Sequence, residues 1–289
     1  MNREPIEVRL YGAAGAVGNA TAQVRTRSGN AAVVLLHGGP GAPSSVADLA
    51  RELASDFHVL EPLQRRASVT PLTVQRHVDD LAAIAPDYAA IVGHSWGAML
   101  ALSYAARHPR RVRSLTLIGC GTYDADTRAA YRKAVERRLT PDDRAGIDEI
   151  GQQLAAVTDQ TSRDRFFAEF GQIFNRVDSF DPLPHTPTSL SPDERGFNET
   201  WPDVLRLQES GIEPAAFSSI VAPTLMLHGD DDPHPGPAIR DTLIRHIPHL
   251  QYIELPRCGH HPWRERHARE PFLNALREWI TQNSTGRQG

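Results

Sequence analysis

The sequence contains only two cysteines, Cys120 and Cys258. They match neither a disulfide framework nor the spacing of metal-binding cysteines, so we expect two free thiols. The N-terminal residues lack the apolar segment of a secretion signal, and no run of about 18 apolar residues occurs anywhere. These absences predict a soluble, cytoplasmic protein that does not contact a membrane.

An excess of basic residues is also absent. The chain has 31 Lys and Arg against 35 Asp and Glu, for a formal net charge of -4. Because this balance offers no broad basic face, it argues against a nucleic-acid partner. With 40% hydrophobic residues, the 289 residues suffice for one large α/β core plus an insertion. We expect a small-molecule or short-peptide substrate; the sequence leaves the oligomeric state open.

Short apolar runs alternate with segments of helical periodicity in both halves of the chain. This alternation predicts a mostly parallel central sheet flanked by helices. The expected strands are residues 6–11, 21–27, 32–36, 57–63, 89–93, 112–120, 222–229 and 250–255. The expected helices are residues 44–55, with Ser44 or Ser45 as the N-cap, 71–84, opened by Thr73, 98–108, 237–246 and 271–282.

The alternation stops between residues 121 and 218, where the chain becomes charged and mostly helical in pattern. It is broken there by the proline-rich stretch "DPLPHTPTSLSPDERG". We therefore predict an α/β core made of residues 1–120 and 219–282, an insertion at 121–218, and a loose tail at 283–289.

The stretch "GHSWG", Gly93 to Gly97, places Ser95 between small residues where a strand gives way to a helix. A nucleophilic serine needs such a strained strand-to-helix turn, because the turn exposes its hydroxyl. The alternative is a serine that merely caps the helix. The strand and helix on either side favour the nucleophile.

The second motif is "HGGPG", His37 to Gly41, directly after a buried strand. Acyl transfer needs two N–H donors aimed at the developing oxyanion, one from this loop and one from the residue after the nucleophile. Gly39 and Trp96 are the candidate backbone donors. A plain tight turn is the alternative, since the spacing of a phosphate-binding loop is missing.

Acidic residues and histidines follow the last two expected strands. One of Asp230, Asp231 and Asp232 should orient a histidine, and either His260 or His261 should be that histidine. The order serine, acid, histidine is the one that an α/β-hydrolase requires. We expect His37 and His94 instead to satisfy backbone groups or to pack near the site.

A metal site is the competing interpretation of these side chains, since carboxylates and imidazoles bind metals. No helical pair of metal-binding histidines accompanies them, and adjacent aspartates in one loop point in different directions, so no metal and no cofactor are predicted. The residues of this alternative are Asp230, Asp231, Asp232, His234, His260 and His261.

Together these segments resemble the α/β-hydrolase fold, and within it the serine peptidases similar to proline iminopeptidase. The resemblance implies that the acid is Asp232, three residues after Gly229, and that the histidine is His260, directly after a glycine. It also implies that the insertion is a helical cap after the sixth strand, which shapes the substrate pocket. The residues that carry it are HGGPG at 37–41, GHSWG at 93–97, Gln64-Arg65, Thr73 and Asp79-Asp80-Leu81.

Two departures from this family pattern bear on the substrate. The glycines that usually follow the Gln-Arg pair are missing, so we expect a differently shaped loop at residues 66–68. The family's cap acids, which recognise a free amino terminus, have no clear counterpart among the cap glutamates Glu169, Glu194, Glu199 and Glu209.

The chemistry predicted is that of a serine hydrolase acting through an acyl-enzyme, with Ser95 as nucleophile, His260 as base and Asp232 as orienting acid. Three functions stay open: an aminopeptidase similar to proline iminopeptidase, a carboxylesterase or lactonase for small neutral esters, and a non-catalytic receptor on the same fold. An esterase pocket should be apolar. Candidate lining residues are Phe166, Phe167, Phe170 and Phe174, which also suit the cap's own core.

Overall fold

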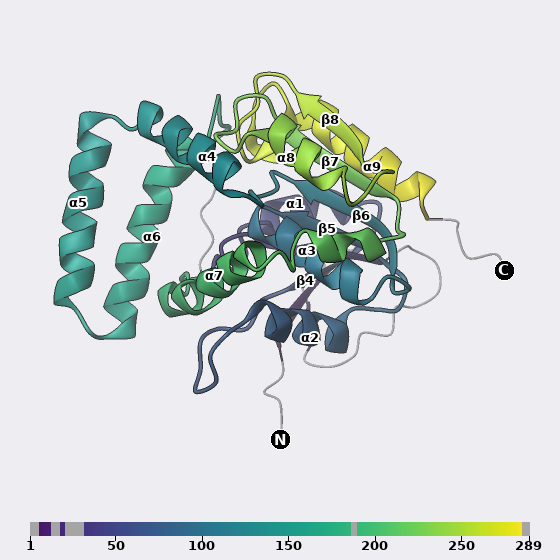
Figure 1. The fold of residues 1–289 in the computed structure, drawn as a ribbon, viewed down its shortest axis with the longest axis horizontal. Coiled ribbons are helices and arrows are strands. Elements are labelled where there is room, and N and C mark those ends of the chain that lie inside the picture. Colours follow the sequence, from purple (N-terminus) through teal and green to yellow (C-terminus); the bar gives the residue numbers. More distant parts are fainter. Residues whose placement is uncertain (1–5, 13–17, 21–31, 186–189, 285–289) are drawn as a thin grey trace.

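The computed structural model describes residues 6–12, 18–20, 32–185 and 190–284, and has one central sheet with helices on both faces (Figure 1). The eight strands of this described part run in the order β2-β1-β4-β3-β5-β6-β7-β8. Their bounds are β1 (Val8–Tyr11), β2 (Gly18–Ala20), β3 (Ala32–Leu36), β4 (His58–Pro62), β5 (Ala89–His94), β6 (Val112–Ile118), β7 (Thr224–Gly229) and β8 (Gln251–Leu255).

The strands from β3 to β8 pair in parallel, and only β1 is antiparallel to its neighbours β2 and β4. The prediction of a mostly parallel sheet flanked by helices is therefore confirmed. Every residue of β3, β5, β6 and β7 is buried, which is why these strands read as continuous apolar runs. The strand expected at residues 21–27 lies outside the described residues.

Two hydrophobic clusters cover the two faces of the sheet. The first packs α2, α3 and α8 against one face, and the second packs α1 and α9 against the other. Because parallel strands need crossover helices, this two-sided cover follows from the strand order. The bounds are α1 (Ala47–Leu53), α2 (Val74–Ile84), α3 (Trp96–Arg107), α8 (Gly236–Leu243) and α9 (Arg269–Gln282).

One of the two expected N-caps is wrong. Thr73 caps α2 as predicted, its side chain accepting from the Arg76 N–H at 3.1 Å. The N-cap of α1 is Val46, not Ser44 or Ser45. Both serines bind other partners: Ser44 Oγ accepts from Arg9, and Ser45 Oγ accepts from the Gly38 N–H.

The insertion between β6 and β7 contains α4 (Ala125–Arg138), α5 (Pro141–Ala156), α6 (Gln160–Val177) and α7 (Glu194–Glu209). Helices α5 and α6 form a hairpin that projects from the core at the left of Figure 1, and α7 lies beside α2. The N-cap side chains of the four helices each accept a backbone N–H, which fixes where each helix begins. These caps are Asp124, Thr140, Asp159 and Asp193.

Helix α7 is fastened to the core by its acids. Glu199 accepts from the Leu72 N–H at 2.9 Å, and Asp203 accepts from the Val74 N–H at 2.9 Å. These two bonds attach the insertion to the segment that opens α2.

Cys120 and Cys258 are both buried and free, as predicted. Within the described ranges, none of the helices combines the length and the apolar character needed to cross a membrane.

Candidate active site

Ser95 occupies a strained turn between β5 and α3. Its φ of 55° lies in the left-handed region that non-glycine residues rarely adopt. The flanking glycines make this turn possible: a Cβ on Gly93 would stand 2.2 Å from the Gly97 carbonyl oxygen, and one on Gly97 would stand 2.3 Å from that of Leu36. The local sequence therefore folds into the strained turn that the serine-nucleophile interpretation requires, and within residues 93–97 only Ser95 is partly exposed.

The HGGPG loop lies directly against this turn. A Cβ on Gly38 would stand 3.3 Å from the Ser95 Cβ, and Gly39 has a φ of 116°, open mainly to glycine. Within the part of the chain that the structure describes, neither Gly39 nor Trp96 has a protein acceptor for its backbone N–H. Both N–H groups therefore stay free to donate to a bound oxygen.

Gln64 connects the two loops that carry these N–H groups. Its Nε2 donates to the His37 carbonyl oxygen at 2.9 Å, and its Oε1 accepts from the Trp96 indole N–H at 2.7 Å. The Gln64 backbone N–H donates to His37 Nε2 at 3.1 Å, so His37 carries its proton on Nδ1 and donates to the Gly38 carbonyl. His37 thus satisfies backbone groups, as predicted.

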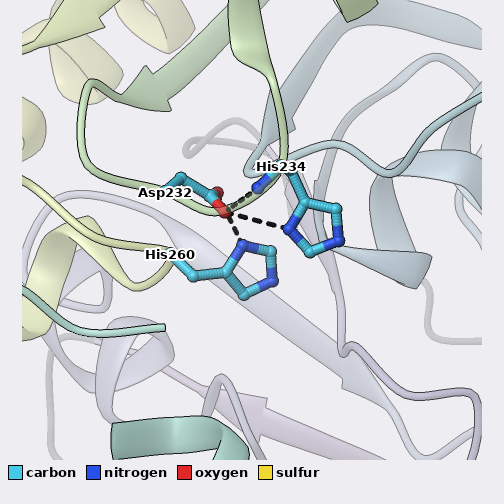
Figure 2. Close-up of side chains that lie close together, drawn as sticks. All are labelled: Asp232, His234 and His260. Atoms are coloured by element: carbon cyan, nitrogen blue, oxygen red, sulfur yellow. Dashed lines mark hydrogen bonds and ion pairs between the residues drawn. The ribbon is translucent and has the colours of Figure 1, made fainter. Parts of the chain in front are cut away.

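The acid and the histidine favoured by the family resemblance are hydrogen-bonded to each other. His260 Nδ1 donates to Asp232 Oδ2 at 2.7 Å, and the Asp232 side chain is fully buried (Figure 2). Asp232 follows β7 and His260 follows β8, so adjacent strand ends bring them together. Of the alternatives, Asp230 Oδ1 accepts from the Cys258 N–H, and Asp231 pairs with Arg138.

Asp232 and His260 each stabilise the charged form of the other. Burial acts to raise the pKa of Asp232, but His260, His234 and His228 hold it well below its usual range. Burial would lower the pKa of His260, but the charge and hydrogen bond of Asp232 raise it above its usual value. Asp232 is therefore ionised at neutral pH, and His260 is a stronger base than an ordinary buried histidine.

Ser95 and His260 each lie next to the residues that end β6. The Ser95 N–H donates to the Ile118 carbonyl at 2.8 Å, and a Cβ on the next residue, Gly119, would stand 2.9 Å from His260 Nδ1. Among the described contacts the Ser95 hydroxyl and the His260 ring are not hydrogen-bonded, and such contacts commonly tighten only with substrate. The serine turn and the His260 ring thus lie against adjacent residues of one chain segment, Ile118 and Gly119.

His94 and His261 pack behind His260 instead of binding Asp232. The ring centroid of His94 lies 4.7 Å from those of both His260 and His261, and its Nε2 donates to the His260 carbonyl oxygen at 3.0 Å. His261 also packs on Trp263. Burial holds the pKa of both His94 and His261 well below its usual range, so both are neutral.

The sequence suggests His234 only as part of the metal alternative. In the structure it binds Oδ1 of Asp232, the carboxylate oxygen that His260 does not use. Asp232 Oδ1 accepts from the His234 N–H and from its Nδ1, each at 2.9 Å (Figure 2). The position two residues after the acid was visible in "DDDPHPG", but only the folded turn shows that the ring bends back to the same carboxylate.

Asp178, at the end of α6, was also missed. It is buried, its Oδ1 has no hydrogen-bond partner among the described residues, and its backbone carbonyl oxygen accepts from the His260 N–H at 2.7 Å. Burial raises the pKa of this carboxyl, although His260 and His234 oppose the shift. A second acid thus lies near the histidine pair.

The metal interpretation involves three of its six candidate residues. Asp232, His234 and His260 offer possible ligand atoms within 4.8 Å of one another. Both carboxylate oxygens already accept hydrogen bonds from the two rings, so protons on nitrogen account for this geometry. We assign no metal to it.

None of the four cap glutamates is a buried carboxylate without a partner. Glu194 forms an ion pair with Arg163 at 2.6 Å, and Glu199 binds the Leu72 N–H and Arg195. Glu169 and Glu209 are exposed. These four residues therefore offer no buried, unpaired carboxylate.

A model of the alpha/beta hydrolase family matches residues 33–272. The chain belongs to this family. The match covers both parts of the core and the insertion between them, in agreement with the resemblance drawn from the sequence motifs.

Curated relatives differ in their named activities. The chain is 27% identical over 217 residues to 2-hydroxymuconate semialdehyde hydrolase from Pseudomonas putida, a match that covers 72% of this chain and 68% of the relative. It is 24% identical over 283 residues to proline iminopeptidase from Lactobacillus helveticus, covering 90% and 93%. Hydrolase chemistry is common to these names, and the bond cleaved is not.

Solved structures agree on the fold. A thermophilic esterase from Thermogutta terrifontis superposes with a TM-score of 0.61 at 20% identity, covering 97% of this chain and 94% of that one. Proline iminopeptidase from Mycobacterium smegmatis gives 0.58 at 19% identity, covering 96% and 94%. At such identities the likeness concerns the fold alone.

Proposed function

We propose that this protein is a serine hydrolase that works through an acyl-enzyme formed on Ser95. The observation that supports it most is the buried 2.7 Å bond between Asp232 and His260, together with the strained turn at Ser95. A carboxylate on Nδ1 leaves Nε2 of the imidazole unprotonated, which is the form that a general base needs.

In this mechanism the Ser95 oxygen attacks the carbonyl carbon while His260 Nε2 takes the hydroxyl proton. The N–H groups of Gly39 and Trp96 stabilise the oxyanion, and His260 then returns the proton to the leaving-group oxygen. Water next attacks the acyl carbon with His260 again as base, which releases the acid and restores the serine.

We favour a small neutral ester or lactone as the substrate. The engaged or exposed state of the four cap glutamates argues against recognition of an ammonium group. Three half-buried phenylalanines of α6, Phe167, Phe170 and Phe174, form a row of ring contacts that also includes Phe197 of α7. Only Phe166 of the predicted set is buried in the cap. Half-buried rings suit an apolar substrate.

An aminopeptidase similar to proline iminopeptidase is the second candidate. It is supported by relatives of that name that align over 90% of this chain and by the HGGPG loop against Ser95. Such an enzyme needs a carboxylate for the substrate amine, and Asp178, near His260 and His234, is a buried acid whose Oδ1 has no partner among the described residues.

A substrate panel separates these functions. Short-chain nitrophenyl esters and lactones are compared with proline, alanine and leucine arylamides, with Ser95→Ala as the control for each activity. We expect hydrolysis of the esters that depends on Ser95 and little on the arylamides. Faster turnover of the proline arylamide would favour the aminopeptidase, and no turnover of any substrate would favour the receptor.

A further inference from the structure

Two imidazoles donate hydrogen bonds to the Asp232 carboxylate, and the Nε2 of a third, His228, lies 3.3 Å from its Oδ2. His260 Nδ1 donates to Oδ2 at 2.7 Å, and His234 Nδ1 donates to Oδ1 at 2.9 Å (Figure 2). The carboxylate is ionised, so it only accepts, and both rings must therefore carry a proton on Nδ1. The mechanism proposed above uses only one of these two rings.

The two rings are also stacked. Their planes are 21° apart with centroids 4.7 Å from each other, and Tyr131 of α4 stacks on the far side of His234 at 4.2 Å and 24°. A row of three rings thus runs from the insertion to the candidate base. The row connects the cap physically to His260.

A third histidine, His228, forms a hydrogen bond with the turn that carries His234. His228 Nε2 donates to the His234 carbonyl oxygen at 3.0 Å, which places its proton on Nε2. Burial lowers the pKa of His228, so it is a neutral donor here. His234 is consequently fixed by its own N–H, its ring nitrogen and its carbonyl oxygen.

We propose that His234 is a positioning residue of the hydrolytic site, which holds the Asp232 carboxylate in place and couples His260 to helix α4 through Tyr131. This proposal rests on the proposed function for its catalytic consequence. Its structural content, two histidines with Nδ1 protons on one carboxylate, does not depend on turnover.

The bond from His234 should change the pKa of His260 in one direction. A hydrogen bond from His234 withdraws negative charge from Asp232, so the carboxylate stabilises the protonated form of His260 less than it otherwise would. Loss of that donor should make His260 hold its proton more tightly. The other titratable or charged groups near the two rings are His228, Asp178, His94, His261, Tyr131 and Arg138.

Two substitutions separate the hydrogen bond from the stack. His234→Phe keeps an aromatic ring and loses the donor, whereas His234→Asn can still donate an amide N–H to Asp232 Oδ1. His246→Asn is the matched control, because the ring of that half-exposed histidine after α8 bonds, among the described residues, to Ser218 Oγ alone. Circular dichroism and thermal melting establish that each variant folds.

We expect His234→Phe to lower kcat/KM on a nitrophenyl ester about tenfold or more, because Asp232 gains rotational freedom. The acidic limb of its profile of kcat/KM against pH should move to higher pH by about half a pH unit or more. His234→Asn should keep a profile close to that of the wild type. Unchanged profiles for both variants, with an active wild type, would overturn the proposal while leaving the proposed function intact.

Nitrogen-15 NMR of histidine in the unmodified protein tests the same claim without any variant. We expect Nδ1–H tautomers for both His234 and His260 at neutral pH, together with two low-field proton resonances. An Nε2–H tautomer at His234 would contradict the proposal even if the protein hydrolyses esters. An inactive protein with both Nδ1–H tautomers would contradict only the proposed function.

Discussion

The indole N–H of Trp96 donates to Gln64 Oε1 at 2.7 Å, which ties the residue after Ser95 to the loop that follows β4. The Gln64 amide also donates to the His37 carbonyl, so one side chain connects the two loops that carry the candidate oxyanion donors. Backbone N–H groups stabilise an oxyanion only when held in position beforehand.

Gln64→Leu should therefore slow the chemical step more than it destabilises the fold. We expect a fall in kcat of about tenfold or more with a small change in KM, because the N–H groups act mainly in the transition state. Gln75→Leu is the control, since Gln75 is exposed on α2 and its side chain reaches only Asp79. Equal kinetics for the two variants would argue against the role of Gln64.

The packing of Gly97 predicts that the serine turn tolerates no side chain there. Gly97→Ala would bring a methyl group to within 2.3 Å of the Leu36 carbonyl oxygen. We expect a loss of unfolding free energy of about 3 kcal/mol. Gly151→Ala is the matched control: this exposed glycine of α5 has open space around it, and the change should stabilise by about 0.5–1 kcal/mol. Urea melts compare the two.

The ion pair of Asp232 and His260 predicts the pH dependence of activity. A general base must be neutral, and Asp232 raises the pKa of His260 above its ordinary value of 6.5. We expect kcat/KM to rise with pH and to reach half its maximum above pH 6.5. Asp232→Asn should move this midpoint to lower pH and reduce kcat by a factor on the order of 10⁴. A midpoint that does not move would contradict the pairing.

A separate pH effect on stability should come from Glu61 in β4. Its side chain is buried and accepts from the Tyr11 hydroxyl, and burial raises its pKa from 4.5 to about 7, although Tyr11 and Arg9 oppose the shift. The unfolded chain loses this proton near pH 4.5 and the folded chain only near pH 7, so stability falls as pH rises between these values.

Glu61→Gln removes that titration. At pH 8 we expect the free energy of unfolding of the variant to exceed that of the wild type by on the order of 1 kcal/mol. At pH 4.5 the difference should be smaller. Thermal and urea melts at the two pH values measure it. A wild type that is more stable than Glu61→Gln at pH 8 would contradict this account, since the folded protein would then favour the ionised form of Glu61.

Most of the sheet could be predicted from the sequence, because strands such as β5 and β6 are buried on both faces and read as unbroken apolar runs. The start of α1 could not. Ser44 and Ser45 have the right chemistry for an N-cap, but their hydroxyls bind Arg9 and the Gly38 N–H, partners that only the tertiary fold brings close.

In the candidate site, too, some residues could be predicted from the sequence and others could not. Chain order and strand ends predict that one of three adjacent aspartates lies near His260 or His261, and the family resemblance selects Asp232 and His260 among them. His234 and Asp178 depend instead on how a turn folds back and on where α6 ends, which no periodicity encodes. Short-range patterns predict backbone elements, whereas the second partner of a buried carboxylate depends on tertiary structure.

The central claim is that Ser95 is an activated nucleophile, and intact-mass spectrometry after treatment with a fluorophosphonate tests it most directly. We expect one adduct on the wild type, mapped by peptide digestion to Ser95, absent in Ser95→Ala and formed far more slowly in His260→Gln. Folded wild-type protein that stays unlabelled, or labelling at another serine, would contradict the account.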